Sequence, residues 1–133
     1  MSDETDEKTP YVEIGGAETI NRLVDTFYDR MESLPDARTI RDMHAADMKG
    51  IRLVFKLYLT EWLGGPDVYS SRRGHPRLRA RHMPFSIGAA ERDQWLLCMR
   101  GALDATIENE AIRNDIFEAM SRLADHMRNR ADG

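Results

Sequence analysis

The chain has 133 residues, the length of a single domain, and its 19 basic and 23 acidic side chains give a formal net charge of −4. The negative charge argues against a non-specific nucleic-acid-binding protein, and the single cysteine excludes an internal disulfide framework and a cysteine-based zinc site. With 41% hydrophobic residues and no run near the ~20 apolar residues of a membrane span, we expect a soluble protein without membrane contact.

The first ten residues differ in composition from the rest. They are acidic and polar with little to bury, so we expect residues 1–10 to form a disordered tail and residues 11–133 to form the folded domain. The tail lacks both the basic and the apolar part of a secretory signal, which favours a cytoplasmic location. Beyond it, apolar residues recur at the spacing of amphipathic helices in four long segments. These segments are 17–31, 48–62, 90–107 and 110–128.

Shorter elements are expected between the long helices. A short helical turn is predicted over residues 37–43. After the Gly-Gly-Pro sequence at 64–66, the polar stretch 67–74 is predicted to be a loop, and residues 76–82 a helix of about two turns that Pro84 ends. A helix this short is marginal in water, so it needs an anchor. No segment alternates like a β-strand, so we expect an all-α fold with one short helix on a long connector.

Most reactive motifs are absent from the sequence, which has no phosphate-binding glycine loop, no His-Glu-x-x-His zinc motif and no serine elbow. A helical protein without such sites can bind a haem, which needs little more than one axial histidine. Of the four histidines, His126 is expected on the surface near a helix end, and His75 is expected in the loop before Pro76. The position of His44 does not decide between a structural and a ligand-binding role. His82 ends the short helix, which iron ligation would anchor, although a packed or exposed histidine is the commoner outcome for this spacing alone.

Several motifs in order resemble the group II truncated haemoglobins. The longest is segment 74–85, GHPRLRARHMPF, which looks like the proximal segment of that family. The others are Gly15-Gly16 before Phe27-Tyr28, Gly64-Gly65-Pro66, and 91–96 with Cys98-Met99. The similarity runs from about Tyr11 to the final helix, and the ordered combination is specific.

The resemblance implies a two-over-two helical sandwich around a haem b (iron protoporphyrin IX), with the proximal histidine on the short helix. By that resemblance His82 is the axial ligand. The family places polar or aromatic side chains on the opposite face, and the corresponding residues here are Tyr28, Trp95 and His44. A phenol O–H and an indole N–H directed at bound O2, which carries partial negative charge, would slow its release.

The sequence departs from ordinary globins on this distal face. Ile51 stands at the position of their distal histidine and Phe55 one turn later, so both haem-facing residues are apolar and hydrogen bonds must come from elsewhere. Because an imidazole titrates near neutral pH, we predict that His44 makes the polarity of the distal pocket depend on pH. A separate hypothesis is that Tyr28 or His44 ligates the ferric iron when no gas is bound.

Further residues are expected to contact the haem. Met83 and Phe85 are predicted as apolar contacts beside the axial histidine. Arg79, Arg81 and Tyr69 are predicted partners of the propionates, because a guanidinium pairs bidentately with a carboxylate. The alternative for the arginines is a solvated position on the short helix.

The predicted function is reversible binding of O2 and of other diatomic ligands such as NO or CO. The alternative is a redox enzyme in which the same pocket oxidises nitric oxide or uses peroxide, since the same donors would stabilise the charge that develops. Sustained oxidation of nitric oxide needs a reductase partner, because the sequence has no flavin- or nicotinamide-binding motif. A gas sensor lacks support without an attached output domain. Both a monomer and a homodimer remain open.

Overall fold

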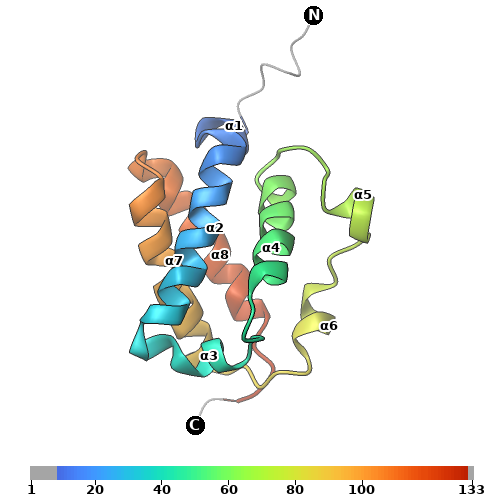
Figure 1. The fold of residues 1–133 in the computed structure, drawn as a ribbon, viewed down its shortest axis with the longest axis vertical. Coiled ribbons are helices and arrows are strands. Elements are labelled where there is room, and N and C mark those ends of the chain that lie inside the picture. The colour runs from blue at the N-terminus through green and yellow to red at the C-terminus, as the bar shows by residue number, and fades with distance from the viewer. Residues whose placement is uncertain (1–8, 132–133) are drawn as a thin grey trace, which may run out of the picture.

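The computed structural model of the chain describes residues 9–131, and four long helices build it (Figure 1). They are α2 (Gly16–Ser33), α4 (Lys49–Trp62), α7 (Ala89–Thr106) and α8 (Glu110–His126). Helix α2 packs against both α4 and α7, and α7 packs against α8. This range contains no β-strand, which confirms the predicted all-α fold, and none of its helices is long and apolar enough to cross a membrane.

Five short elements complete the described chain. They are α1 (Pro10–Glu13), the 3-10 helix η2 (Pro35–Ala37), α3 (Arg38–Asp42), α5 (Ser70–Arg73) and α6 (Leu78–His82). In Figure 1, α5 and α6 lie on a long connector beside α4. The prediction of a loop over residues 67–74 was wrong where α5 forms. This helix is a single turn of polar residues, so it has no apolar periodicity that could predict it.

Two predicted boundaries are also corrected by the structure. Helix α6 begins at Leu78 and not at Pro76, because Arg77 has a φ of 49°, a left-handed conformation that does not continue a regular helix. At the other end of the chain, Pro10 already lies in α1, and the Thr9 side chain accepts a hydrogen bond from the Val12 amide at 3.3 Å. Folded structure therefore begins inside the predicted tail, whose residues 1–8 lie outside the described range.

The core lies mainly between α2 and α7. Leu23 and Phe27 of α2 are fully buried, as are Cys98, Met99 and Leu103 of α7. Full burial of a Leu, Phe or Met side chain stabilises the fold by about 1.5–3 kcal/mol relative to exposure. This shared core fixes the relative position of the two helices that carry the predicted distal tyrosine and tryptophan.

Helix α4 ends in a tight turn that two glycines make possible. Gly64 has a φ of 96°, in the region that favours glycine. A β-carbon on Gly65 would lie 2.8 Å from the carbonyl oxygen of Thr60 and 2.9 Å from the ring of Tyr11. Helix α1 therefore packs closely on the end of α4, and the predicted stop after α4 is confirmed.

Candidate functional site

Aromatic side chains from α2, α4 and α7 meet in one cluster. The ring centroid of Phe27 lies 4.8 Å from that of Tyr28 and 5.1 Å from that of Trp95. Phe55 of α4 joins them, with its centroid 6.0 Å from Tyr28 and 6.2 Å from Trp95. Tilted and edge-on ring contacts of this kind contribute about 0.5–1.5 kcal/mol each beyond their burial. The fold thus brings together three residues that the sequence predicted for the distal face.

Tyr28 adds a hydroxyl group to this cluster. Its side chain is 4% exposed, and the hydroxyl makes no hydrogen bond with any residue in the range 9–131. Burial raises the pKa of the phenol, although the positive charge of Arg52 opposes the rise. The Arg52 guanidinium lies 5.7 Å from the centroid of the Tyr28 ring, and ion pairs with Asp25 and Asp29 hold it there. Tyr28 therefore stays neutral near pH 7 and keeps its O–H available as a donor.

Trp95 offers a second donor. Its half-buried indole N–H has no hydrogen-bond acceptor in the part of the chain that the structure describes. Tyr28 and Trp95 therefore bring two donors from neighbouring helices to one aromatic cluster.

His44 lies beside Tyr28, with the two ring centroids 5.9 Å apart. Its Nδ1 atom is 2.8 Å from the carbonyl oxygen of Ile40, which can only accept a hydrogen bond, so Nδ1 carries the proton. Burial lowers the pKa of His44, and the nearby positive charges of Arg41 and His82 lower it further, against the effect of the Ile40 hydrogen bond. At neutral pH the ring is therefore uncharged and Nε2 is an acceptor.

His82 is the last residue of α6 and is half-buried. Its Nδ1 atom lies 2.6 Å from the carbonyl oxygen of Leu78, which leaves Nε2 with a free lone pair. A histidine whose other ring nitrogen donates to a carbonyl is the usual arrangement in a metal ligand.

Three large apolar side chains, from α4 and from the segment after α6, are exposed. Ile51 is 38% exposed, Phe85 39% and Met83 58%, although each is a residue type that is normally buried. Exposed apolar groups that flank polar ones often mark a ligand site. A planar apolar group with an iron at its centre would cover these side chains and take the lone pair of His82, so the residues present fit a haem.

The three residues predicted to contact the propionates are engaged within the chain. The Arg79 guanidinium donates to two backbone carbonyls at the end of α8. Arg81 donates through Nε to the carbonyl of Pro76 at 2.8 Å. Tyr69 is buried, and its ring is edge-on to that of Tyr58 at 5.7 Å between centroids. Their contacts with propionates stay predictions.

Two residues of the site, Arg52 and Asn129, carry no functional signal in the sequence. Phe27 belongs to the Phe27-Tyr28 motif but was not predicted as a site residue, and it lies at the centre of the aromatic cluster. Arg52 is one of many charged residues, and its place over Tyr28 depends on how α4 packs on α2. The side chain of Asn129 donates to the carbonyl of His82, a contact across 47 residues that no local pattern predicts.

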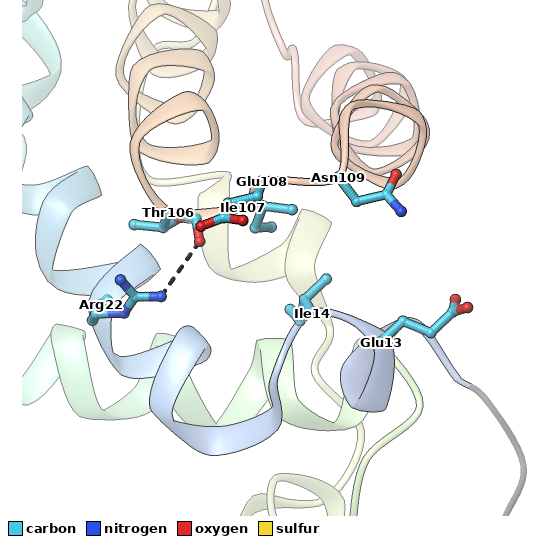
Figure 2. A pocket seen from close by; sticks show the side chains of 7 residues that line it. All are labelled: Glu13, Ile14, Arg22, Thr106, Ile107, Glu108 and Asn109. Atoms are coloured by element: carbon cyan, nitrogen blue, oxygen red, sulfur yellow. Dashed lines mark hydrogen bonds between the residues drawn. The ribbon is translucent and has the colours of Figure 1, made fainter.

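A separate hollow lies toward the N-terminal end of α2, beside the turn that joins α7 to α8 (Figure 2). Arg22 donates there to the carbonyl of Thr106 at 3.5 Å. The residues that line it are Glu13, Ile14, Arg22, Thr106, Ile107, Glu108 and Asn109. None of the predicted site residues is among them, so the aromatic cluster and not this hollow is the candidate site.

The sequence of this chain is similar to a known protein family. The bacterial-like globin family matches residues 9–129. Group 2 truncated hemoglobin YjbI of Bacillus subtilis (strain 168) is 39% identical, over 92% of this chain and 90% of its own length.

Solved structures share the arrangement of helices. The group II 2-on-2 hemoglobin from the plant pathogen Agrobacterium tumefaciens is 48% identical with a TM-score of 0.92, covering 99% of this chain and 100% of its own. The cold-adapted truncated hemoglobin from the Antarctic marine bacterium Pseudoalteromonas haloplanktis TAC125 is 41% identical with a TM-score of 0.91, covering 92% of this chain and 99% of its own. The predicted two-over-two helical arrangement is confirmed by these similarities.

Proposed function

This chain belongs to the bacterial-like globin family, as a truncated haemoglobin of group II, and on that premise we propose that His82 is its axial haem ligand and that Tyr28 and Trp95 stabilise bound O2. Globins are haem proteins that bind gaseous ligands. When bound, a haem b supplies the iron at which a diatomic gas is held. The side chains of this chain then decide how tightly the gas is held and how fast it leaves.

The axial role of His82 is supported by its ring geometry. The Nδ1–H group donates a hydrogen bond to the Leu78 carbonyl at 2.6 Å, which holds the ring in one tautomer. The lone pair of Nε2 is then free to bind a metal ion. His75 on the same connector is exposed, and its Nδ1 accepts a hydrogen bond from the Arg77 amide at 3.0 Å, so its ring is engaged in a local turn.

The observation that carries the proposal is the pair of unpaired donors in one aromatic cluster. The Tyr28 O–H and the Trp95 N–H have no acceptor within residues 9–131. A ligand with partial negative charge would accept from both, and a hydrogen bond to a charged acceptor contributes about 1.5–3 kcal/mol. Each donor is therefore expected to slow release of O2 by about ten- to a hundredfold.

His44 adds a pH-dependent element to the proposal. At neutral pH its Nε2 can only accept, so it does not donate to the ligand. Protonation would turn Nε2 into a third donor. Because burial lowers the pKa of His44 below its usual 6.5, we expect this change only in acid.

The test is the visible spectrum and the pyridine haemochrome of the purified protein, with His82→Ala and His75→Ala as matched variants. We expect a Soret band with near-stoichiometric haem in the native chain and in His75→Ala, and its loss or strong shift in His82→Ala. A native spectrum in His82→Ala would reject the axial assignment. A colourless native protein that refuses added hemin would reject the proposed haem site itself.

A second measurement separates gas binding from a redox enzyme that uses the same pocket. The rate of O2 release is compared with the rate at which peroxide drives oxidation of a phenolic dye. Slow release with negligible turnover supports the binding function. Fast, saturable turnover that is lost in Tyr28→Phe would favour the enzyme.

A further inference from the structure

His82 lies at the end of α6, a helix too short to be stable by itself. Helix α6 has five residues, well below the ~12 that an isolated helix needs in water. Arg77 before it is in the left-handed region, and Met83 after it is 58% exposed. The position of His82 must therefore be set by contacts from elsewhere in the fold.

Asn129, just beyond the end of α8, supplies four hydrogen bonds to this segment. Its Nδ2 atom donates to the carbonyl of His82 at 3.2 Å and to the carbonyl of Phe85 at 2.8 Å. Its Oδ1 atom accepts from the Ile87 amide at 2.8 Å, and its own amide donates to the Ile87 carbonyl at 2.8 Å. We call these four hydrogen bonds the Asn129 clasp.

The segment that the Asn129 clasp binds is a turn. The Phe85 amide donates to the His82 carbonyl at 3.0 Å, so the turn over residues 82–85 has its own hydrogen bond. Both N–H groups of one carboxamide then go to the carbonyls at the two ends of this turn. Rotation of the backbone at His82 would break hydrogen bonds to Asn129 and to Phe85 together.

Asn129 is itself held on both sides. The next residue, Arg130, pairs with Glu91 at 2.6 Å, and Glu91 accepts a hydrogen bond from the Gly88 amide at 2.7 Å at the start of α7. On the other side, Arg79 of α6 donates to two carbonyls at the end of α8. The clasp is therefore anchored to α6, α7 and α8 and can act as a fixed support.

We propose that Asn129 is a positioning residue that sets the orientation of the His82 imidazole. The inference rests on the axial role proposed for His82. The clasp holds the backbone of His82, and the Leu78 carbonyl holds its Nδ1 atom at 2.6 Å. With both ends of the residue held, the direction of the Nε2 lone pair is defined before any ligand is bound.

The test measures the iron–histidine stretching band of the reduced, ligand-free holoprotein by resonance Raman spectroscopy, in Asn129→Asp and Asn129→Ala. Asn129→Asp keeps the size of the side chain and the acceptor for the Ile87 amide, but it turns a carboxylate toward two carbonyls. We expect the band to shift or split in both variants.

A matched control comes from Asn109, which caps α8 by accepting a hydrogen bond from the Ile112 amide at 3.1 Å. Asn109→Ala is expected to lower stability by about 1 kcal/mol through the lost cap, a fold-change of about five in the unfolding equilibrium, and to leave the band unchanged. The control separates a loss of stability from a change at the iron.

Two results would overturn the positioning role. One is an unchanged band in both Asn129 variants, and the other is an equal shift in Asn109→Ala. If Asn129→Ala does not fold, Asn129→Asp decides by the same criterion. Failure of the axial assignment has a different signature, because the wild type would then lack the band or His82→Ala would retain it, and the inference would fall with the assignment.

Discussion

Tyr28→Phe removes one oxygen atom and leaves the ring in its contacts with Phe27 and Phe55. The hydroxyl belongs to a side chain that is 4% exposed, and it has no partner among residues 9–131. The hydroxyl oxygen is not among the fully buried side-chain atoms that lack a partner, so its removal is expected to change the free energy of unfolding of the haem-free protein by less than about 0.5 kcal/mol. Urea unfolding of the haem-free protein measures this effect.

In the holoprotein the same change is expected to weaken the hold on the gas ligand. The variant loses a hydrogen bond of about 1.5–3 kcal/mol to a partly charged acceptor, which corresponds to O2 release about ten- to a hundredfold faster. Stopped-flow displacement of O2 by CO measures the release rate. A variant whose stability without haem is unchanged and that releases O2 faster with haem would show that the hydroxyl serves the ligand and not the fold.

Tyr58→Phe is the matched control for this change. Tyr58 lies in α4 and stacks on Phe55, but its ring lies against Tyr69 on the side of the connector. We expect the loss of the Tyr58 hydroxyl to leave the rate of O2 release unchanged. An unchanged release rate in Tyr28→Phe, or an equal acceleration in Tyr58→Phe, would refute the reasoning.

Three further changes test other parts of the structure. Trp95→Phe keeps a ring but loses the N–H, so O2 release should accelerate by about tenfold, and an unchanged rate would leave Tyr28 as the main donor. Arg52→Met breaks the ion pairs that join α4 to α2, so urea unfolding should show a loss of about 1 kcal/mol that shrinks in high salt; a loss independent of salt would point to packing instead. The hydrogen bond from the Gly88 amide, helped by a nearby arginine, holds the pKa of Glu91 below its usual 4.5. Its stabilising effect is therefore fully present above pH 4.5 and is lost as the pH falls through the lowered pKa. In Glu91→Gln the free energy of unfolding should depend less steeply on pH below 4.5, and an unaltered slope would contradict this account.

The long helices could be predicted because each has one apolar face. Their observed ends differ from the predicted ends by at most two residues, since a face of core residues at helical spacing is a local property of the chain. The same logic fails for α5, a single turn of Ser and Arg, and for the start of α6. There Arg77 takes a left-handed conformation that the pattern of apolar residues does not predict.

Tyr28, Trp95 and His82 were predicted as site residues from the motifs around them, and their roles remain predictions for the tests above. Arg52 and Asn129 could not be found in this way. Each of these two contacts a site residue on another helix or segment, so its sequence neighbours say nothing about it.

The sequence by itself determined the long helices, because apolar residues recur at helical spacing within each segment and this is a local property of the chain. Only the tertiary structure decided that donors from α2 and α7 share one cluster, and that the amide of Asn129 holds the carbonyl of His82. Such contacts depend on how whole helices pack. A hydrogen bond between residues 47 positions apart produces no periodic pattern in the sequence that could predict it. The packing of the helices therefore sets the geometry on which ligand binding is expected to depend.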